Sequence, residues 1–212
     1  MQLAILLFDQ LTALDAVGPY EVLHNLPDAE VVFVGERTGP VATESGGLRL
    51  VADATLAEVV RPDLVLVPGG PGQNALMTPG PVHDWLRAVD ASSTWTTSVC
   101  TGSLVLAAAG LLTGRRATTY WLATDQLAAL GAIPVQERYV VDGKYVTAAG
   151  VSAGIDMALA LAGLIAGDAV AEAIQLGIEY DPRPPYGAGS PDRAPVDVVA
   201  QLRSRSRFAL PG

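Results

Sequence analysis

Cys100 is the only cysteine in the chain, and Thr101, Gly102 and Ser103 follow it directly. The apolar segment before it, Thr96–Val99, predicts a buried strand, and Thr101–Ala109 predicts a helix. Cys100 would then lie in a sharp turn at a helix N-terminus, where free N–H groups favour a thiolate and lower the pKa of the thiol. A reactive nucleophile is therefore predicted. The alternative is a space-filling side chain, because free cysteines are often buried.

Two further segments could serve the same chemistry. The predicted strand Asp63–Val67 runs into Gly69 and Gly70, whose backbone N–H groups could stabilise a negative charge, although such glycines also make ordinary tight turns. Asp15 lies between the first predicted strand and a helix. It could cap that helix or direct its carboxylate toward Cys100, and the two roles can coexist.

Histidine is scarce, with only His24 and His83 in the chain. His24 falls late in a predicted helix and His83 in a polar helix start, so both are expected at the surface. A Cys–His pair is therefore poorly supported, and with it thiol proteolysis. No spacing of His, Cys, Asp and Glu resembles a metal-ligand set, so no metal is expected.

Composition narrows the function classes. Of the 212 residues, 50% are hydrophobic and 17% charged, which excludes a disordered chain. The net charge of −9 argues against binding to nucleic acid or to an anionic membrane. A single cysteine excludes an intrachain disulfide, and neither a signal peptide nor a membrane span is recognisable. We expect a cytoplasmic protein.

The elements that must position these residues alternate between short apolar runs and helical patterns. This alternation predicts an α/β fold, with a mostly parallel sheet covered by helices on both faces. The predicted strands are Leu3–Phe8, Glu30–Val34, Asp63–Val67 and Thr96–Val99, and the helices between them are Ala16–Asn25, Pro81–Ala91 and Thr101–Ala109.

Hairpins and a tail complete the prediction. Val41–Glu44 with Leu48–Val51, and Arg138–Val141 with Tyr145–Thr147, are predicted hairpins, the second around Asp142-Gly143. Ser152–Ile165 and Asp168–Tyr180 are predicted helices. An extended tail at about residues 181–195 and a short helix, Val196–Arg205, follow. We assign residues 1–212 to a single domain.

Several of these segments resemble the ThiJ/PfpI superfamily. The similar segments are the first strand with Asp15, the Val67–Gly70 turn, Ser98–Ser103, Gly110–Trp121 and Thr147–Asp156, and the resemblance covers about residues 1–186. It implies a flavodoxin-like sandwich in which a strand-to-helix elbow carries the nucleophile. Relatives are usually homodimers, so a homodimer is expected.

Within the superfamily, the enzymes that add water to an isonitrile are the most similar, on Asp15, Cys100-Thr101 and the Asp181–Tyr186 tail. This resemblance implies an N-substituted formamide as product, formed through a thioimidate on Cys100. Asp15 and Thr101 would be the other catalytic residues, and no cofactor is implied. The pocket residues would be Gly69 and Gly70 with Thr101 for the developing anion, and Tyr120, Trp121 and Gly150 as walls.

The sequence departs from many superfamily members at Tyr120, where they have histidine, and at Asp15, where they have glutamate. A carboxyl group beside a thiolate resists ionising, so Asp15 is predicted to be neutral during part of the cycle. Two other functions stay open. One is a glyoxalase or deglycase-like reaction on a small aldehyde, and the other is a redox sensor or chaperone that uses Cys100.

Overall fold

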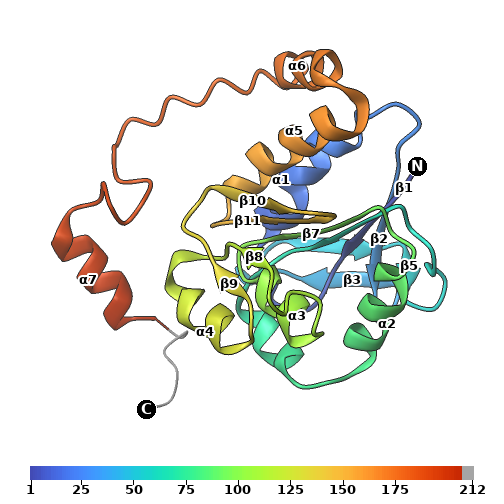
Figure 1. Cartoon of the computed structure of the whole chain (residues 1–212), viewed down its shortest axis with the longest axis horizontal. Coiled ribbons are helices and arrows are strands. Elements are labelled where there is room, and N and C mark those ends of the chain that lie inside the picture. The colour runs from blue at the N-terminus through green and yellow to red at the C-terminus, as the bar shows by residue number, and fades with distance from the viewer. Residues whose placement is uncertain (207–212) are drawn as a thin grey trace.

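The computed structural model describes residues 1–206. Residues 207–212, the end of the domain that we assigned, lie outside the described residues. Figure 1 shows a central sheet between two layers of helices, with the last helix standing apart from them. This is the flavodoxin-like α/β arrangement that the sequence predicts.

The central sheet has seven strands in the order β10-β11-β7-β6-β1-β2-β5. Every neighbouring pair is parallel except the β10–β11 hairpin. In chain order these strands are β1 (Gln2–Leu6), β2 (Glu30–Gly35), β5 (Ala54–Thr55), β6 (Leu64–Val67), β7 (Trp95–Val99), β10 (Tyr139–Asp142) and β11 (Tyr145–Ala148). The carboxyl end of β7 lies between those of β6 and β11, so the residues that follow these three strands meet.

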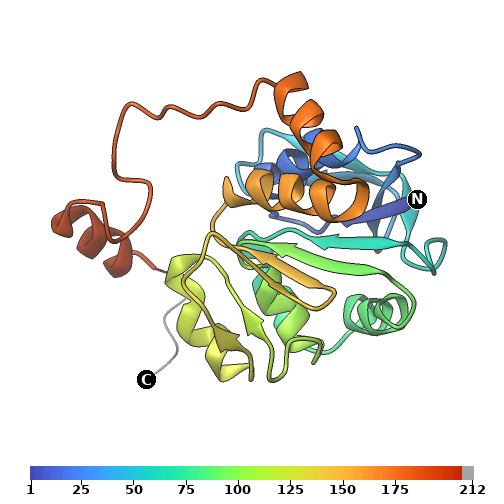
Figure 2. The same ribbon diagram turned by 45° about the horizontal axis from the view of Figure 1, so that its top comes forward.

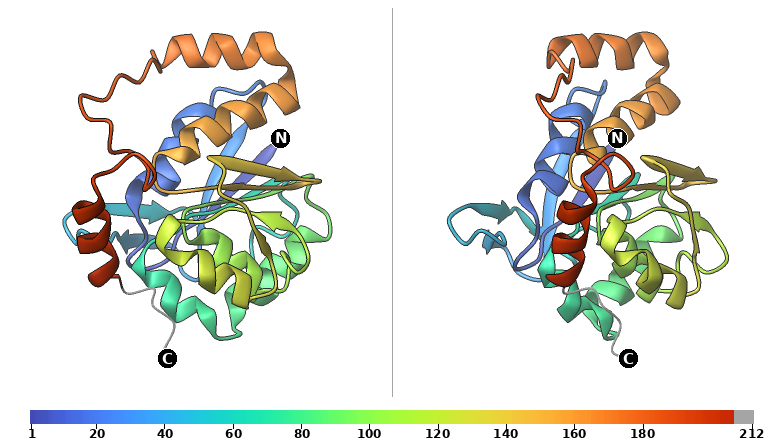
Figure 3. Two further views of the ribbon diagram at one scale, coloured as in Figure 1. Left: turned by 60° about the vertical axis from the view of Figure 1, so that its left-hand side comes forward. Right: turned by 90° about the vertical axis from the view of Figure 1, so that its left-hand side faces the viewer.

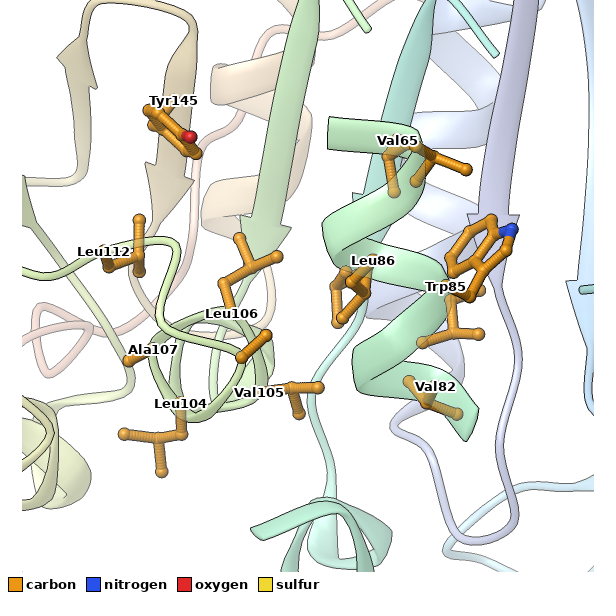
Figure 4. Packing of buried hydrophobic residues seen from close by; sticks show 14 of the residues in the cluster. Val65, Val82, Trp85, Leu86, Leu104, Val105, Leu106, Ala107, Leu112 and Tyr145 are labelled. Atoms are coloured by element: carbon orange, nitrogen blue, oxygen red, sulfur yellow. The ribbon is translucent and has the colours of Figure 1, made fainter. Parts of the chain in front are cut away.

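Helices cover both faces of the sheet (Figure 1). One layer holds α1 (Ala13–Leu23), α5 (Ala153–Ala166) and α6 (Asp168–Gly177), and the other holds α2 (Pro81–Asp90), α3 (Gly102–Ala108) and α4 (Thr124–Ala129). Each layer encloses its own apolar core. Figure 4 shows the second core, where Trp85 and Leu86 of α2 lie near Val65 of β6 and the α3 side chains lie beside them.

The predicted elements are present, with some differences at their ends. Helix α1 begins at Ala13 rather than Ala16, and α6 ends at Gly177 rather than Tyr180. The sequence patterns did not predict α4, the 3-10 helices η1 (Pro71–Met77) and η2 (Trp121–Ala123), or the two-residue strands β5, β8 (Arg116–Ala117) and β9 (Ile133–Pro134). These elements are too short to leave a clear period in the sequence.

The hairpin of β3 (Gly39–Ala42) and β4 (Arg49–Ala52) stands outside the central sheet. It is anchored by an isolated parallel bridge between Leu11 and Thr43. Gln10 N–H also donates to the carbonyl of Ala42 at 2.8 Å. The loop between β3 and β4 is therefore fixed beside the start of α1.

The chain after α6 leaves the body of the protein. Residues 181–195 contain neither helix nor strand, and α7 (Val196–Ser204) follows. Figures 2 and 3 show this arm looping outward before α7. Helix α7 has no buried residue, and its Arg203 guanidinium lies 5.7 Å from the centre of the Trp121 ring.

Among the described residues, no helix is both long enough and apolar enough to cross a membrane.

Candidate active site

Cys100 occupies the elbow between β7 and α3 with a positive φ of 56°. A residue other than glycine adopts this left-handed conformation only when its surroundings enforce it. The backbone N–H of Cys100 donates to the carbonyls of Ala148 and Ala149, at 3.1 and 2.8 Å. Its carbonyl accepts hydrogen bonds from the hydroxyls of Ser103, at 3.2 Å, and Thr119, at 3.0 Å.

Gly102 allows the elbow to pack against β6. A Cβ atom on this residue would lie only 2.0 Å from the carbonyl oxygen of Val67. The strand and the helix therefore approach more closely than any other residue type allows. The elbow presents the Cys100 side chain at the sheet edge with 5% of its surface exposed.

Asp15 lies in the first turn of α1 and is 0% exposed. Its Oδ2 accepts the N–H of Gly69 at 2.9 Å. Its Oδ1 accepts no hydrogen bond from the described residues, and the Cys100 thiol is close enough for each group to shift the pKa of the other. The helix-cap interpretation is wrong, because Thr12 occupies the N-cap and Asp15 lies within the helix.

Burial raises the pKa of Asp15 from 3.8 to about 7, although the Gly69 N–H and the Cys100 thiol act in the opposite direction. The negative charge of Glu44 adds to the rise in the pKa of Asp15. This direction agrees with the expectation that Asp15 is neutral during part of the cycle.

The expectation of a lowered pKa for Cys100 is contradicted. Burial and the charge of Asp15 hold the pKa of the thiol well above its ordinary value, and the N–H groups of Thr101 and Val151 at the sulfur offset this only in part. Helix α3 has only seven residues, so its dipole is small beside the cost of burying a charge. The resting group is a thiol beside a carboxyl group with a raised pKa.

Thr101 and the two glycines are held together at this edge. The N–H of Gly70 donates to Oγ1 of Thr101 at 3.0 Å, so it is already engaged rather than free for an anion. At Gly69, a Cβ atom would lie 2.5 Å from the Thr101 nitrogen and 2.9 Å from Oδ2 of Asp15. The glycines thus let the turn after β6 contact both proposed catalytic side chains.

A cavity of about 130 Å³ opens onto Cys100. It is lined by Thr12, Glu44, Gly70, Pro71, Cys100, Thr101, Tyr120 and Val151. Two expected wall residues, Trp121 and Gly150, are not among them. They lie beside Tyr120: the Trp121 ring packs edge-on with its centre 6.1 Å from that of Tyr120, and a Cβ on Gly150 would lie 3.3 Å from the Tyr120 ring.

The sequence did not identify Thr12, Glu44, Pro71 or Val151 as pocket residues, nor Thr119 as a support of the elbow. Glu44 is the last residue of the predicted strand Val41–Glu44, and nothing in the neighbouring sequence indicates that this hairpin reaches the Cys100 edge. Val151 begins an apolar segment, and this segment predicted a helix but gave no sign of a pocket residue. The signal that could have identified Val151 is its position just after β11, at the carboxyl end of a parallel strand.

The two histidines lie away from the cavity. His24 is exposed, with its ring stacked 5.0 Å from the Tyr20 ring. His83 is only 1% exposed, so its expected place at the surface is wrong. It lies three residues before Leu86 on α2 and shares the face that packs into the core. Burial also lowers the pKa of the His83 imidazole.

The chain is similar to several known proteins. The DJ-1/PfpI family profile matches residues 1–164. The chain is 48% identical over 210 residues to the isonitrile hydratase of Pseudomonas putida, and this match covers 99% of the chain and 92% of the hydratase. It is 39% identical over 125 residues to the HTH-type transcriptional regulator CdhR of Pseudomonas aeruginosa, covering 58% of this chain and 37% of the regulator.

A solved structure extends the similarity to the whole fold. The crystal structure of a ThiJ/PfpI family protein from Pseudomonas syringae superimposes with a TM-score of 0.93 at 36% identity, over 96% of this chain and 85% of that one. The chain belongs to the DJ-1/PfpI family.

Proposed function

We propose that this protein is an isonitrile hydratase, which adds water to an isonitrile to give an N-substituted formamide. The observation that carries the proposal is the buried Asp15–Cys100 pair at the base of a small cavity that neither histidine lines. The 48% identity with a hydratase over nearly the full chain supports it. The pair supplies a nucleophile and a proton carrier, which are the two groups that this hydration needs.

In the first step, the Cys100 sulfur forms a bond to the terminal carbon of the isonitrile. The thiol proton passes through Asp15 to the same carbon, and the product is a thioimidate on Cys100. The step adds S and H to one carbon and needs no external acid. A carboxyl group with a pKa of about 7 can both accept and return a proton near neutral pH.

In the second step, water adds to the thioimidate carbon, and Asp15 passes one proton of this water to the imidate nitrogen. The carbon–sulfur bond then breaks, the remaining proton of the added hydroxyl group passes through Asp15 to sulfur, and the formamide leaves. Cys100 is regenerated as the thiol, so one turnover consumes one isonitrile and one water. Thr101 holds the Gly70 turn through its hydroxyl and directs its own N–H at the sulfur.

The cavity suits a small linear group. Its volume is about 130 Å³. The isonitrile carbon and nitrogen fit beside Cys100, with the substituent directed toward Thr12, Glu44 and Tyr120.

Incubation with a simple alkyl isonitrile tests the proposal, with the formamide followed by chromatography. Cys100→Ser and Cys100→Ala are each expected to lower kcat by about a thousandfold or more. Asp15→Asn should give neither formamide nor, in intact mass spectrometry, a chain carrying one isonitrile, because both proposed steps use the Asp15 carboxyl group. Absence of formamide with reduced, folded wild-type protein would refute the function, and turnover of methylglyoxal instead would favour the glyoxalase alternative.

The redox-sensor alternative receives less support from the geometry. Oxidation of cysteine proceeds through the thiolate and needs access to it. Cys100 is 5% exposed, and its pKa is raised by burial and by Asp15. Both features slow reaction with a dilute oxidant.

We also infer that two copies of the chain form a homodimer, as the resemblance to the superfamily implies. The arm of residues 181–195 and α7 leaves large apolar side chains exposed, including Tyr186, Val196 and Leu202. Light scattering should give twice the chain mass for the full chain. A truncation before Asp181 that still gives twice its own chain mass would show that the arm has no part in dimer formation.

A further inference from the structure

The segment between β11 and α5 holds Cys100 at two atoms. The N–H of Cys100 donates to the carbonyl of Ala149 at 2.8 Å, and the N–H of Val151 donates to the Cys100 sulfur. Val151 also lines the cavity that opens onto Cys100. The conformation of residues 149–152 therefore fixes both the backbone and the sulfur of the nucleophile.

Arg138 contacts both ends of this segment. It lies directly before β10, and its carbonyl accepts the N–H of Ala149 at 3.0 Å. Its Nε donates to Oδ2 of Asp156 at 2.6 Å, and its Nη2 lies 2.5 Å from the same oxygen. Nη2 also donates to the hydroxyl of Ser152 at 3.3 Å. One residue thus joins the end of β11 to the first turn of α5.

Asp156 is the centre of a clamp that consists of Arg138, Asp156 and Tyr180. It lies in the first turn of α5, where the helix dipole favours a negative charge. The hydroxyl of Tyr180, directly before the arm, lies 3.2 Å from each carboxylate oxygen of Asp156. The carboxylate therefore contacts two arginine nitrogens and one hydroxyl, a network that restricts it more than a single exposed ion pair does. The clamp residues do not line the cavity, so they would act through the segment rather than on the substrate.

We propose that Arg138 and Asp156 are positioning residues for catalysis, which hold residues 149–152 so that the Val151 N–H is directed at the Cys100 sulfur. With this N–H in place, the Cys100 side chain keeps one orientation toward the cavity, where the isonitrile carbon must bond. The effect on turnover rests on the proposed function. The position of the Val151 N–H does not, because it can be measured without a substrate.

The amide proton resonance of Val151 in a heteronuclear NMR spectrum reports this hydrogen bond. Cys100→Ala removes the acceptor and gives the resonance position of the released N–H. In Arg138→Gln and in Asp156→Asn, the Val151 resonance should move from its wild-type position toward the position in Cys100→Ala. These two substitutions remove charges of opposite sign, so a direct effect of charge would move the resonance in opposite directions. Release of the segment moves it in the same direction.

Two further variants separate the clamp from a general loss of surface charge. Arg138→Lys keeps the charge but not the fork of two nitrogens, so its Val151 resonance should lie between those of Arg138→Gln and wild type. Arg87→Gln on α2 is the matched control, because Arg87 pairs with Asp84 at 2.5 Å and has nearly the same exposure as Arg138. It should leave the Val151 resonance and kcat at their wild-type values.

Turnover of a simple alkyl isonitrile tests the catalytic part. Arg138→Gln and Asp156→Asn should each lower kcat by about two- to fivefold, the effect of losing a partly exposed charged pair, with little change in KM. A Val151 resonance that stays in place, or moves in opposite directions in the two variants, would overturn the positioning role. A moved resonance with wild-type kcat would overturn its part in catalysis. Absence of formamide from wild type, with the expected movement of the resonance, would instead refute the proposed function and leave the clamp as the support of the Cys100 sulfur.

Discussion

Replacing Asp15 by asparagine should make the protein more stable at alkaline pH while it abolishes the proposed catalysis. The carboxyl group is completely buried and accepts one backbone hydrogen bond, from the N–H of Gly69. A buried carboxylate that is incompletely hydrogen-bonded costs free energy, because it loses its hydration. Asparagine keeps the size and an acceptor oxygen for Gly69 but never carries that charge.

The magnitude follows from the pKa of Asp15. A rise from 3.8 to about 7 corresponds to about 4 kcal/mol, at about 1.4 kcal/mol per pH unit. The folded state binds this proton more tightly than the unfolded state. The stabilisation is therefore complete below pH 3.8 and is lost as the pH rises through about 7. Between pH 5.5 and 8 the loss is about 2 kcal/mol.

In Asp15→Asn this loss should disappear. At pH 8 the variant should be more stable than wild type by about 1–3 kcal/mol, once the cost of about 1–3 kcal/mol for an unpaired amide N–H is subtracted from the 4 kcal/mol. Urea unfolding of both proteins at pH 5.5 and 8 measures the four free energies. Asp192→Asn in the exposed arm is the control and should follow wild type. Equal pH dependence in Asp15→Asn and wild type would refute a buried carboxyl group with a raised pKa.

Three other predictions follow from the site and the core. Gly102→Ala should destabilise the fold by about 3 kcal/mol in urea unfolding, because the new methyl would overlap the Val67 carbonyl; a normal midpoint would contradict this close approach. Thr119→Val, which removes one of two hydroxyls on the Cys100 carbonyl, should cost about 1 kcal/mol and lower kcat; full activity would show that this hydrogen bond does not position the elbow. His83→Leu should become more stable relative to wild type as the pH falls below 6.5, because the imidazole takes up a proton in the unfolded chain more readily than in the folded core. Parallel plots of unfolding free energy against pH for the two proteins would contradict the lowered pKa of His83.

The fold could be predicted because each central strand has a local signature. Apolar runs such as Leu64–Val67 and Trp95–Val99 are short, β-branched and followed by turn residues, as buried parallel strands require. The proximity of Asp15 to Cys100 was also predictable, since residues that follow the parallel strands of one sheet lie along the same edge, here with only β6 between β1 and β7.

The remaining features depend on contacts that no local pattern encodes. Glu44 reaches the cavity only because the β3–β4 hairpin is anchored through the Leu11–Thr43 bridge. His83 looked like an exposed residue because Asp84 and Arg87 are close to it in sequence, yet the helix turns it toward the core. The pKa of Cys100 depends on burial and on Asp15 together, and spacing indicates neither quantity.

The raised pKa of Cys100 changes what the proposed mechanism requires, but it does not rule that mechanism out. An enzyme whose nucleophile must attack as a free thiolate needs a cationic partner, and neither histidine of this chain lines the cavity. Hydration of an isonitrile differs, because sulfur and hydrogen both bond to the same carbon. The thiol proton is therefore a reactant, and keeping it at the Asp15–Cys100 pair places it where it is consumed. On this argument, burial and the carboxyl neighbour, which oppose thiolate formation, favour the addition because they retain the proton that it uses.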